Sequence, residues 1–305
     1  MVELNLENTN SDGILAAMVR ARNASGSPAL DMVLTLLVVT DEDTVADALE
    51  AAVGLSQEHP ARILGVIRGP AEGEPRLDAR IRVAHDESPE SIVMRMSGPL
   101  VDHAESAVLP LMLPDSPVVV WWAGTPPVNP AADPLGALGQ RRLTDTETTA
   151  APVRTLKTLG RHYSPGDTDL SWTRATPWRA LLAAALDQVA TPVDAAEIEA
   201  GDDNPVAVLL QSWLGLRLKL PVQFTHREGP RIHSVTLYTA AGIVSLKRVD
   251  AHSCEFSVPG SVSRYVPLGT RSITELLAED LRRLDPDDMY AASLRHLLRP
   301  HSRGA

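Results

Sequence analysis

The sequence has 305 residues, of which 44% are hydrophobic and 22% charged, as expected of a globular protein with room for two domains. Its formal net charge of −11 argues against nucleic acid or an anionic membrane as the main partner. The single cysteine, Cys254, excludes an internal disulfide, and neither a secretory signal nor an apolar run of the about 20 residues that cross a bilayer is present; we therefore expect a cytoplasmic protein.

The first half of the chain predicts a layered α/β structure. Apolar runs at 32–39 and 61–69 are typical of strands buried on both faces, and the helix predicted between them makes a βαβ unit. The predicted elements that follow are strands over 78–84 and 91–97, a helix over 100–111, and a strand that ends at Trp121 and Trp122. We expect a largely parallel sheet with flanking helices.

The second half of the chain predicts helices together with a series of short, closely spaced strands. Helices are predicted over 153–160, 177–188, 205–219, 272–284 and 287–299, and short strands over 222–227, 232–239, 243–249, 253–258 and 262–266. The connections between these strands are too short for crossover helices, which predicts antiparallel pairing. The expected fold class is an α/β N-terminal domain, residues 1–168, followed by an α+β C-terminal domain with an antiparallel sheet, residues 169–305.

Catalytic motifs are missing from the sequence. It has no phosphate-binding loop, serine-nucleophile elbow, zinc-protease motif or cysteine cluster, and the glycines of "VIRGPAEGEP" lead to a strand instead of a helix. His103 beside Asp102 could act as a general acid or base or be an exposed helical residue, and Cys254 could be a nucleophile or an inert apolar residue. We expect no catalytic residue, no cofactor and no metal site.

Residues 140–180 are electrostatically distinct, with seven basic residues against four acidic ones. The spacing of Arg154, Lys157 and Arg161 places them on one face of a helix, while Arg174 and Arg179 flank the start of the next helix. This pattern fits a solvated face paired with the protein's own carboxylates. It equally fits a binding site for an anionic surface or a phosphorylated ligand.

Several long blocks resemble one known family. "HPARILGVIRG", "LPDSPVVVWWAGTPP", "DPLGALGQRRLTD", "TDLSWTRATPWRALLAAALD" and "DLRRLDPDDMYAASL" are similar, in this order, to the OpcA family of glucose-6-phosphate dehydrogenase assembly proteins. The resemblance implies a non-catalytic partner that binds this dehydrogenase, promotes its active oligomer and so acts on the oxidative pentose phosphate pathway. Photosynthetic members are associated with redox control through cysteines, whereas one cysteine cannot form an internal dithiol switch.

The family supplies no catalytic residues, so the partner-binding surface is predicted from physical chemistry. Tryptophan and arginine dominate the energetic centres of protein interfaces, and the candidates are Trp121, Trp122, Arg154, Lys157, Arg161, Trp172, Arg174, Trp178 and Arg179. Trp121 and Trp122 point to opposite faces of their strand, which leaves core packing, contact with the dehydrogenase and a ligand wall open. The alternative function is a sugar-phosphate-binding enzyme or sensor that uses the basic 140–180 segment.

Overall fold

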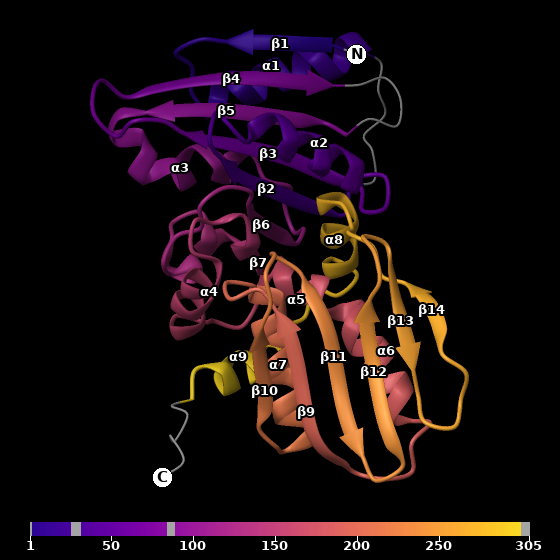
Figure 1. The fold of residues 1–305 in the computed structure, drawn as a ribbon. Coiled ribbons are helices and arrows are strands. Elements are labelled where there is room, and N and C mark those ends of the chain that lie inside the picture. Colours follow the sequence, from indigo (N-terminus) through magenta and orange to yellow (C-terminus); the bar gives the residue numbers. More distant parts are fainter. Residues whose placement is uncertain (1, 26–31, 84–88, 300–305) are drawn as a thin grey trace. The chain divides into compact units, whose positions relative to one another are not determined.

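The computed structural model describes residues 2–25, 32–83 and 89–299 (Figure 1). They form two compact units. The first contains the described residues of Met1–Asp145, Ser164–Thr168 and Ile273–Pro286, and the second those of Thr146–Tyr163, Asp169–Ser272 and Asp287–Ala305. Each unit thus contains segments that are distant in sequence, and a division into independent domains at 168/169 stays a prediction.

The first unit contains an eight-stranded sheet in the order β1-β4-β5-β3-β2-β6-β7-β8. Strands β5, β3, β2, β6 and β7 pair in parallel, whereas β4 is antiparallel to both β1 and β5. Every residue of β2 is buried, which agrees with its unbroken apolar sequence. The strands are β1 (Val2–Leu6), β2 (Leu34–Thr40), β3 (Ala61–Arg68), β4 (Arg76–Val83), β5 (Ser91–Ser97), β6 (Val118–Trp122), β7 (Arg141–Thr144) and β8 (Asp167–Asp169).

Helices cover this sheet. The helix predicted over 100–111 is instead three short pieces, and the α-helical piece ends at Val108 because the ring of Pro110 would clash with the preceding turn. Helix α8 packs on α2, where Gly54 lacks the Cβ that would lie 3.0 Å from Cγ2 of Thr274. The α-helices are α1 (Ser11–Ser25), α2 (Val45–Leu55), α3 (Ala104–Val108) and α8 (Ile273–Asp280), and the 3₁₀ helices are η1 (Gly98–His103), η2 (Leu109–Leu111), η3 (Pro130–Ala132) and η4 (Gly136–Leu138).

The second unit contains a six-stranded sheet in the order β10-β9-β11-β12-β13-β14. All pairs are antiparallel except β9 with β10, which run parallel because the buried helix α7 connects them. The expectation that β10 joins an antiparallel neighbour was therefore wrong, since β9 was not predicted. The strands are β9 (Val193–Ala200), β10 (Val222–His226), β11 (Ile232–Thr239), β12 (Gly242–Arg248), β13 (Ser253–Ser257) and β14 (Arg264–Pro267).

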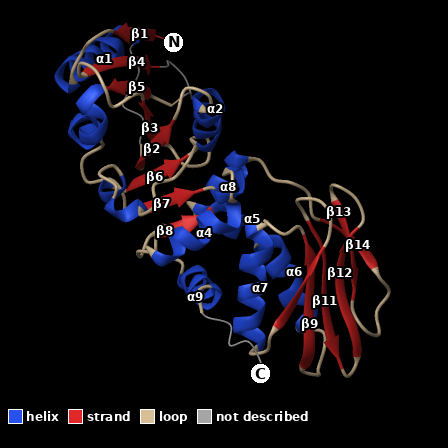
Figure 2. Ribbon diagram, turned by 60° about the vertical axis from the view of Figure 1, so that its left-hand side comes forward, coloured by secondary structure: helices blue, strands red, loops and turns tan. Residues whose placement is uncertain are grey.

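Figure 2 shows that α6 and α7 lie on one face of this second sheet, as the alternating burial of its strands requires. The helices are α4 (Pro152–Arg161), α5 (Leu170–Arg174), α6 (Thr176–Leu186), α7 (Pro205–Leu218) and α9 (Asp288–Leu297), with a 3₁₀ turn η5 (Thr146–Thr148). The predicted order of an α/β and then an α+β fold is confirmed. No helix in the described part of the chain has the length and apolarity to span a membrane.

Candidate interaction surface

The carboxyl ends of β2 and β6 mark the topological switch of the first sheet, where open α/β sheets bind ligands. Here Oδ1 of Asp41 accepts hydrogen bonds from the backbone N–H groups of Asp43 (3.1 Å) and Thr44 (2.9 Å) and from the Thr44 hydroxyl (2.7 Å). The Thr44 hydroxyl is the main cause that lowers the pKa of Asp41. A carboxylate therefore already takes two N–H groups of the turn that leads into α2 and places a negative charge there.

The neighbouring strand ends are also occupied by ion pairs. Arg68, the last residue of β3, binds Oδ1 of Asp133 at 2.9 Å, and Arg95 of β5 binds Oε1 of Glu42 at 2.7 Å. Asp133 in turn accepts the backbone N–H of Leu135 at 3.0 Å. The polar groups at this edge thus pair with one another.

Both tryptophans at the end of β6 are buried, on opposite faces of the strand. Trp122 lies in the hydrophobic core together with Leu135. A Cβ added to Gly136 would lie 1.8 Å from the Pro130 carbonyl oxygen and 3.0 Å from the Trp122 ring, so the loop after β6 encloses this side chain tightly. Neither indole N–H has a hydrogen-bond partner among the described residues.

The acid–base candidate His103 and the nucleophile candidate Cys254 belong to other elements than these strand ends. Asp102 and His103 are both exposed, at the end of η1. Cys254 is buried, and its burial raises the pKa of the thiol, an effect that nearby Arg248 only partly offsets. The described residues contain no cluster of three or more His, Cys, Asp or Glu side chains that could hold a metal ion.

The basic segment separates into paired and unpaired side chains. Arg141 and Arg142 belong to the first unit and are buried, where they form ion pairs with Asp280 and Asp167 respectively. Arg142 also donates to the carbonyl oxygen of Gly139 at 2.8 Å. These two arginines of β7 therefore stabilise the fold of the first unit.

Two further arginines pack inside the second unit. Arg174 binds Glu147 at 2.6 Å, and the Arg179 guanidinium lies 3.6 Å from the centre of the Trp172 ring, in cation–π geometry. The Trp172 indole N–H donates to Asp287 at 2.8 Å. Arg174 and Arg179 are half-buried and Trp172 is buried.

The four tryptophans predicted at the partner surface share one property, which is burial. Their exposed fractions are 3% for Trp121, 1% for Trp122, 2% for Trp172 and 4% for Trp178. Trp178 packs in the core between α6 and the second sheet, and Arg248 lies 5.5 Å from its ring. The structure describes no partner chain, so a role for these residues at an interface stays a prediction.

The remaining predicted residues, Arg154, Lys157 and Arg161, lie on α4, as their spacing indicates. Arg154 and Arg161 are exposed and Lys157 is half-buried. Among the described residues, none of the three side chains has an ion-pair or hydrogen-bond partner. This face of α4 is the free part of the basic segment.

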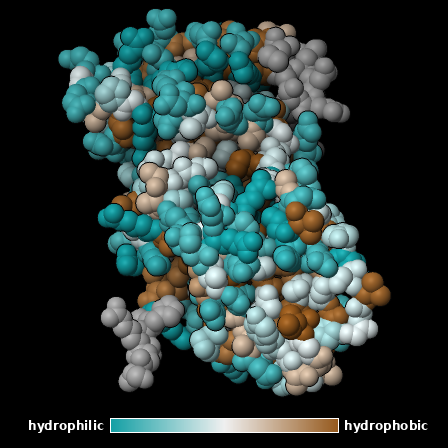
Figure 3. All heavy atoms as spheres, viewed as in Figure 1, coloured by the Kyte–Doolittle hydropathy of each residue, from teal (hydrophilic) through white to brown (hydrophobic). Residues whose placement is uncertain are grey.

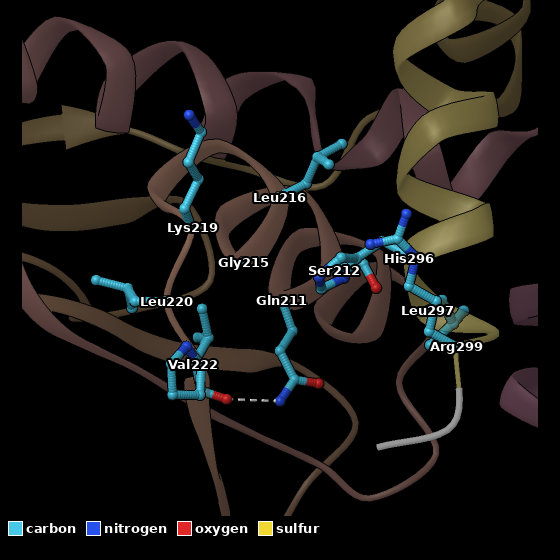
Figure 4. A pocket seen from close by; sticks show the side chains of 11 residues that line it. Gln211, Ser212, Gly215, Leu216, Lys219, Leu220, Val222, His296, Leu297 and Arg299 are labelled. Atoms are coloured by element: carbon cyan, nitrogen blue, oxygen red, sulfur yellow. Dashed lines mark hydrogen bonds between the residues drawn. The ribbon is translucent and has the colours of Figure 1, made fainter. Parts of the chain in front are cut away.

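A groove runs beside α4 on the second unit. One hollow of about 510 Å³ is lined by α4, α9 and β10 and includes Lys157, Arg161 and Arg299. A second, of about 690 Å³, lies between the ends of α7 and α9 and includes Lys219 and Arg299 (Figure 4). Both are lined by Gln211, Leu297 and Arg299, so the two hollows adjoin each other, and together they are called the groove.

Comparison with protein families shows what the chain belongs to. Residues 52–161 match the glucose-6-phosphate dehydrogenase subunit N-terminal domain, and residues 165–294 match the C-terminal domain of the same subunit. The chain belongs to the OpcA family. No curated protein matches it.

Several solved structures resemble this OpcA family member at low sequence identity. They include the 3-ketoreductase KijD10 from Actinomadura kijaniata in complex with NADP, at 12% identity and a TM-score of 0.47, with 87% of this chain and 94% of that chain covered. An oxidoreductase from Sinorhizobium meliloti matches at 11% identity and a TM-score of 0.40, with 86% of each chain covered. Similarity at this level carries no conclusion about activity.

Sequence reasoning missed the other side of the groove in this OpcA family member. Lys219, His296 and Arg299 line it, and none lies within the basic 140–180 segment. Each lies in the last turn of a helix or just after it, where a basic residue is common because it complements the helix dipole, so its presence in the sequence does not indicate a binding site. Only the packing of α9 against α4 and α7 brings Arg299 into the same hollow as Lys157 and Arg161.

Proposed function

We propose that this chain is a non-catalytic assembly factor and allosteric activator of glucose-6-phosphate dehydrogenase. It binds the dehydrogenase, favours its active oligomer, and so acts in the cytoplasm on entry into the oxidative pentose phosphate pathway. The observation that carries this proposal is the match to both OpcA domains, across 52–161 and 165–294. A single activator function accounts for the two domains together.

The first unit supports a non-catalytic role. Its switch-point edge, where a nucleotide-binding sheet receives pyrophosphate on helix N–H groups, carries Asp41, Glu42 and Asp43 instead. Placing a pyrophosphate there would bring like charges together and displace the hydrogen bonds of Asp41. This arrangement favours a scaffold over an enzyme that uses NADP.

The energetic demand on such an activator is small. It must bind the active state of the dehydrogenase more tightly than the inactive state, since equal affinity for both shifts nothing. A tenfold shift of the equilibrium needs about 1.4 kcal/mol of differential binding. A few well-placed contacts supply this difference.

We further propose a role for each of the nine residues predicted at the partner-binding surface. Arg154, Lys157 and Arg161 touch the dehydrogenase, because they are unpaired and stand on one face of α4. Arg174 and Arg179 lie at its margin, and Trp172 and Trp178 hold the helices beneath it. Trp121 and Trp122 act from the core of their own unit, by packing.

The test is a dehydrogenase assay with and without the purified chain. We expect higher activity at a fixed dehydrogenase concentration, together with a larger oligomer in sedimentation velocity. Calorimetry with glucose 6-phosphate and with NADP covers the alternative of a sugar-phosphate enzyme or sensor that uses the 140–180 segment. Tight binding of either compound without any effect on the dehydrogenase would overturn the proposal in favour of that alternative.

A further inference from the structure

The groove beside α4 concentrates positive charge on a protein with a net charge of −11. Lys157, Arg161, Lys219 and Arg299 line it, and within the described chain none of these side chains has an ion-pair or hydrogen-bond partner. The one acidic residue of the lining, Asp202, binds the ring Nδ1 of His226 at 2.7 Å. The groove therefore attracts anions even though the protein as a whole repels them.

Helix ends reduce this potential without cancelling it. Arg161, Lys219 and Arg299 lie at or just after the C-termini of α4, α7 and α9, and each helix end contributes a negative partial charge of about half a unit. Four side-chain cations outweigh three half-charges and the carboxylate of Asp202. The balance at the groove remains positive.

The same helix ends identify the class of ligand. The last carbonyl groups of a helix have no partner within it. At these ends the N–H groups of the following residues bond some of them, as Lys219 does with Gly215 and Arg299 with His296, and the remaining carbonyls are acceptors beside the cations. A free phosphate offers mainly acceptors, and it binds preferentially at the opposite, N-terminal end of a helix. A polypeptide with acidic side chains offers both N–H donors for the carbonyls and carboxylates for the cations.

The lining between the cations is apolar. Leu216, Leu297, Val222 and Phe224 contribute to it, and Figure 3 shows hydrophobic side chains at the surface between α4 and α9 beside a hydrophilic rim over α4. Figure 4 places Lys219 on one side of the larger hollow and His296 and Arg299 on the other. Cations on both sides of an apolar floor suit an extended segment that carries acidic and apolar side chains together.

Two glycines allow this groove to form. A Cβ on Gly215 would lie 2.9 Å from the His296 ring, and a Cβ on Gly160 would lie 3.0 Å from the Leu294 side chain. Because both positions are glycine, α9 packs closely against α7 and α4, which brings Arg299 into both hollows. The cations are therefore held by packed helices and not by a loop.

We propose that this groove binds an extended acidic segment of the dehydrogenase, an inference that rests on the proposed function. The occupant is argued from charge complementarity and from the donors and acceptors above. The chain's own residues 300–305 do not complement the groove, because they contain Arg303 and no acidic residue. Each of the two adjoining hollows, of about 690 and 510 Å³, has the volume of a small-ligand site, and together they give room for a chain segment that passes from one to the other.

The experiment measures the dissociation constant of the full chain for the dehydrogenase by biolayer interferometry, at several salt concentrations. Two double variants reverse the charge at the two ends of the groove, Lys157→Glu with Arg161→Glu and Lys219→Glu with Arg299→Glu. The matched control is Arg231→Glu with Lys247→Glu, two exposed cations outside the groove lining. All three change the net charge equally, and circular dichroism confirms that each is folded.

We expect about tenfold weaker binding and a shallower salt dependence for each groove variant, and no more than about twofold change for the control. Unchanged binding in both groove variants, with the wild type still binding and stimulating the dehydrogenase, would overturn the groove and leave the proposed function standing. Absence of wild-type binding would instead overturn the proposed function. Saturable binding of inorganic phosphate or glucose 6-phosphate that both groove variants abolish would replace the peptide with a small ligand.

Discussion

Trp172 is the residue whose role the structure changes most, and its replacement separates packing from recognition. Trp172 is 2% exposed and packs with Leu156, Leu209, Tyr290 and Leu294. Removal of a buried tryptophan to alanine costs about 3–5 kcal/mol of unfolding free energy. We therefore expect Trp172→Ala to lower stability by a large share of the total, before any partner is present.

Trp172→Phe tests the hydrogen bond while it removes less of the packing, although it also reduces the ring surface on which Arg179 stacks. The phenylalanine keeps most of the ring but removes the N–H that donates to Asp287 at 2.8 Å, while Asp287 still accepts the backbone N–H groups of Met289 (2.9 Å) and Tyr290 (2.8 Å) at the start of α9. A hydrogen bond to a charged group contributes about 1.5–3 kcal/mol, which is the loss we expect. Trp213→Phe, a half-buried tryptophan on α7, is the control and should cost about 1 kcal/mol or less.

Urea unfolding followed by far-UV circular dichroism measures these differences, because replacing a tryptophan disturbs fluorescence. Dehydrogenase binding is measured at low temperature on the fraction that remains folded. If Trp172→Phe left stability unchanged within about 0.5 kcal/mol but weakened binding tenfold, Trp172 would be a contact residue and its assignment to the core would be wrong.

Three other outcomes are expected. Gly136→Ala should destabilise the first unit by about 1–3 kcal/mol in urea unfolding, because the new Cβ meets the Pro130 carbonyl and the Trp122 ring; an unchanged midpoint would show that this loop is loosely packed. Asp41→Ala should cost about 1 kcal/mol at pH 7, because it removes the hydrogen bonds of the carboxylate to Asp43 and Thr44. Since the folded pKa of Asp41 is lowered, its contribution is present above the ordinary pKa of 3.8 and is lost as the pH falls through the folded value; a cost that does not decline as the pH falls below 3.8 would contradict this. Cys254 should react slowly with a thiol reagent in the folded protein and rapidly in urea, because burial raises its pKa; rapid reaction without urea would reveal an accessible thiolate.

The apolar strands and long helices of the fold could be predicted from the sequence, because a run such as 34–40 has few alternatives to a buried strand. The missed strands are polar or short. β7 reads "RRLT" and β8 reads "DTD", and both are buried because their charges are paired, as Arg142 is with Asp167. Such pairing joins residues 25 apart, which no local pattern reveals.

The candidate surface could be predicted only in part, for a related reason. The spacing of Arg154, Lys157 and Arg161 correctly gave one face of a helix, since that pattern is local. Tryptophan content gave no comparable information, because a tryptophan that anchors an interface and one that fills a core look alike in sequence. The groove itself joins α4 to helices that end near residues 218 and 297, so it exists only in the folded chain.

The basic segment therefore contains two kinds of cation that mutagenesis must keep apart. Replacing Arg141 breaks its buried ion pair with Asp280, which costs about 3–5 kcal/mol. Replacing Lys157 or Arg161 breaks no ion pair or hydrogen bond within the described chain, so it should leave stability almost unchanged. A loss of dehydrogenase binding in an Arg141 variant is thus explained by unfolding, whereas the same loss in a Lys157 or Arg161 variant reports on the surface itself.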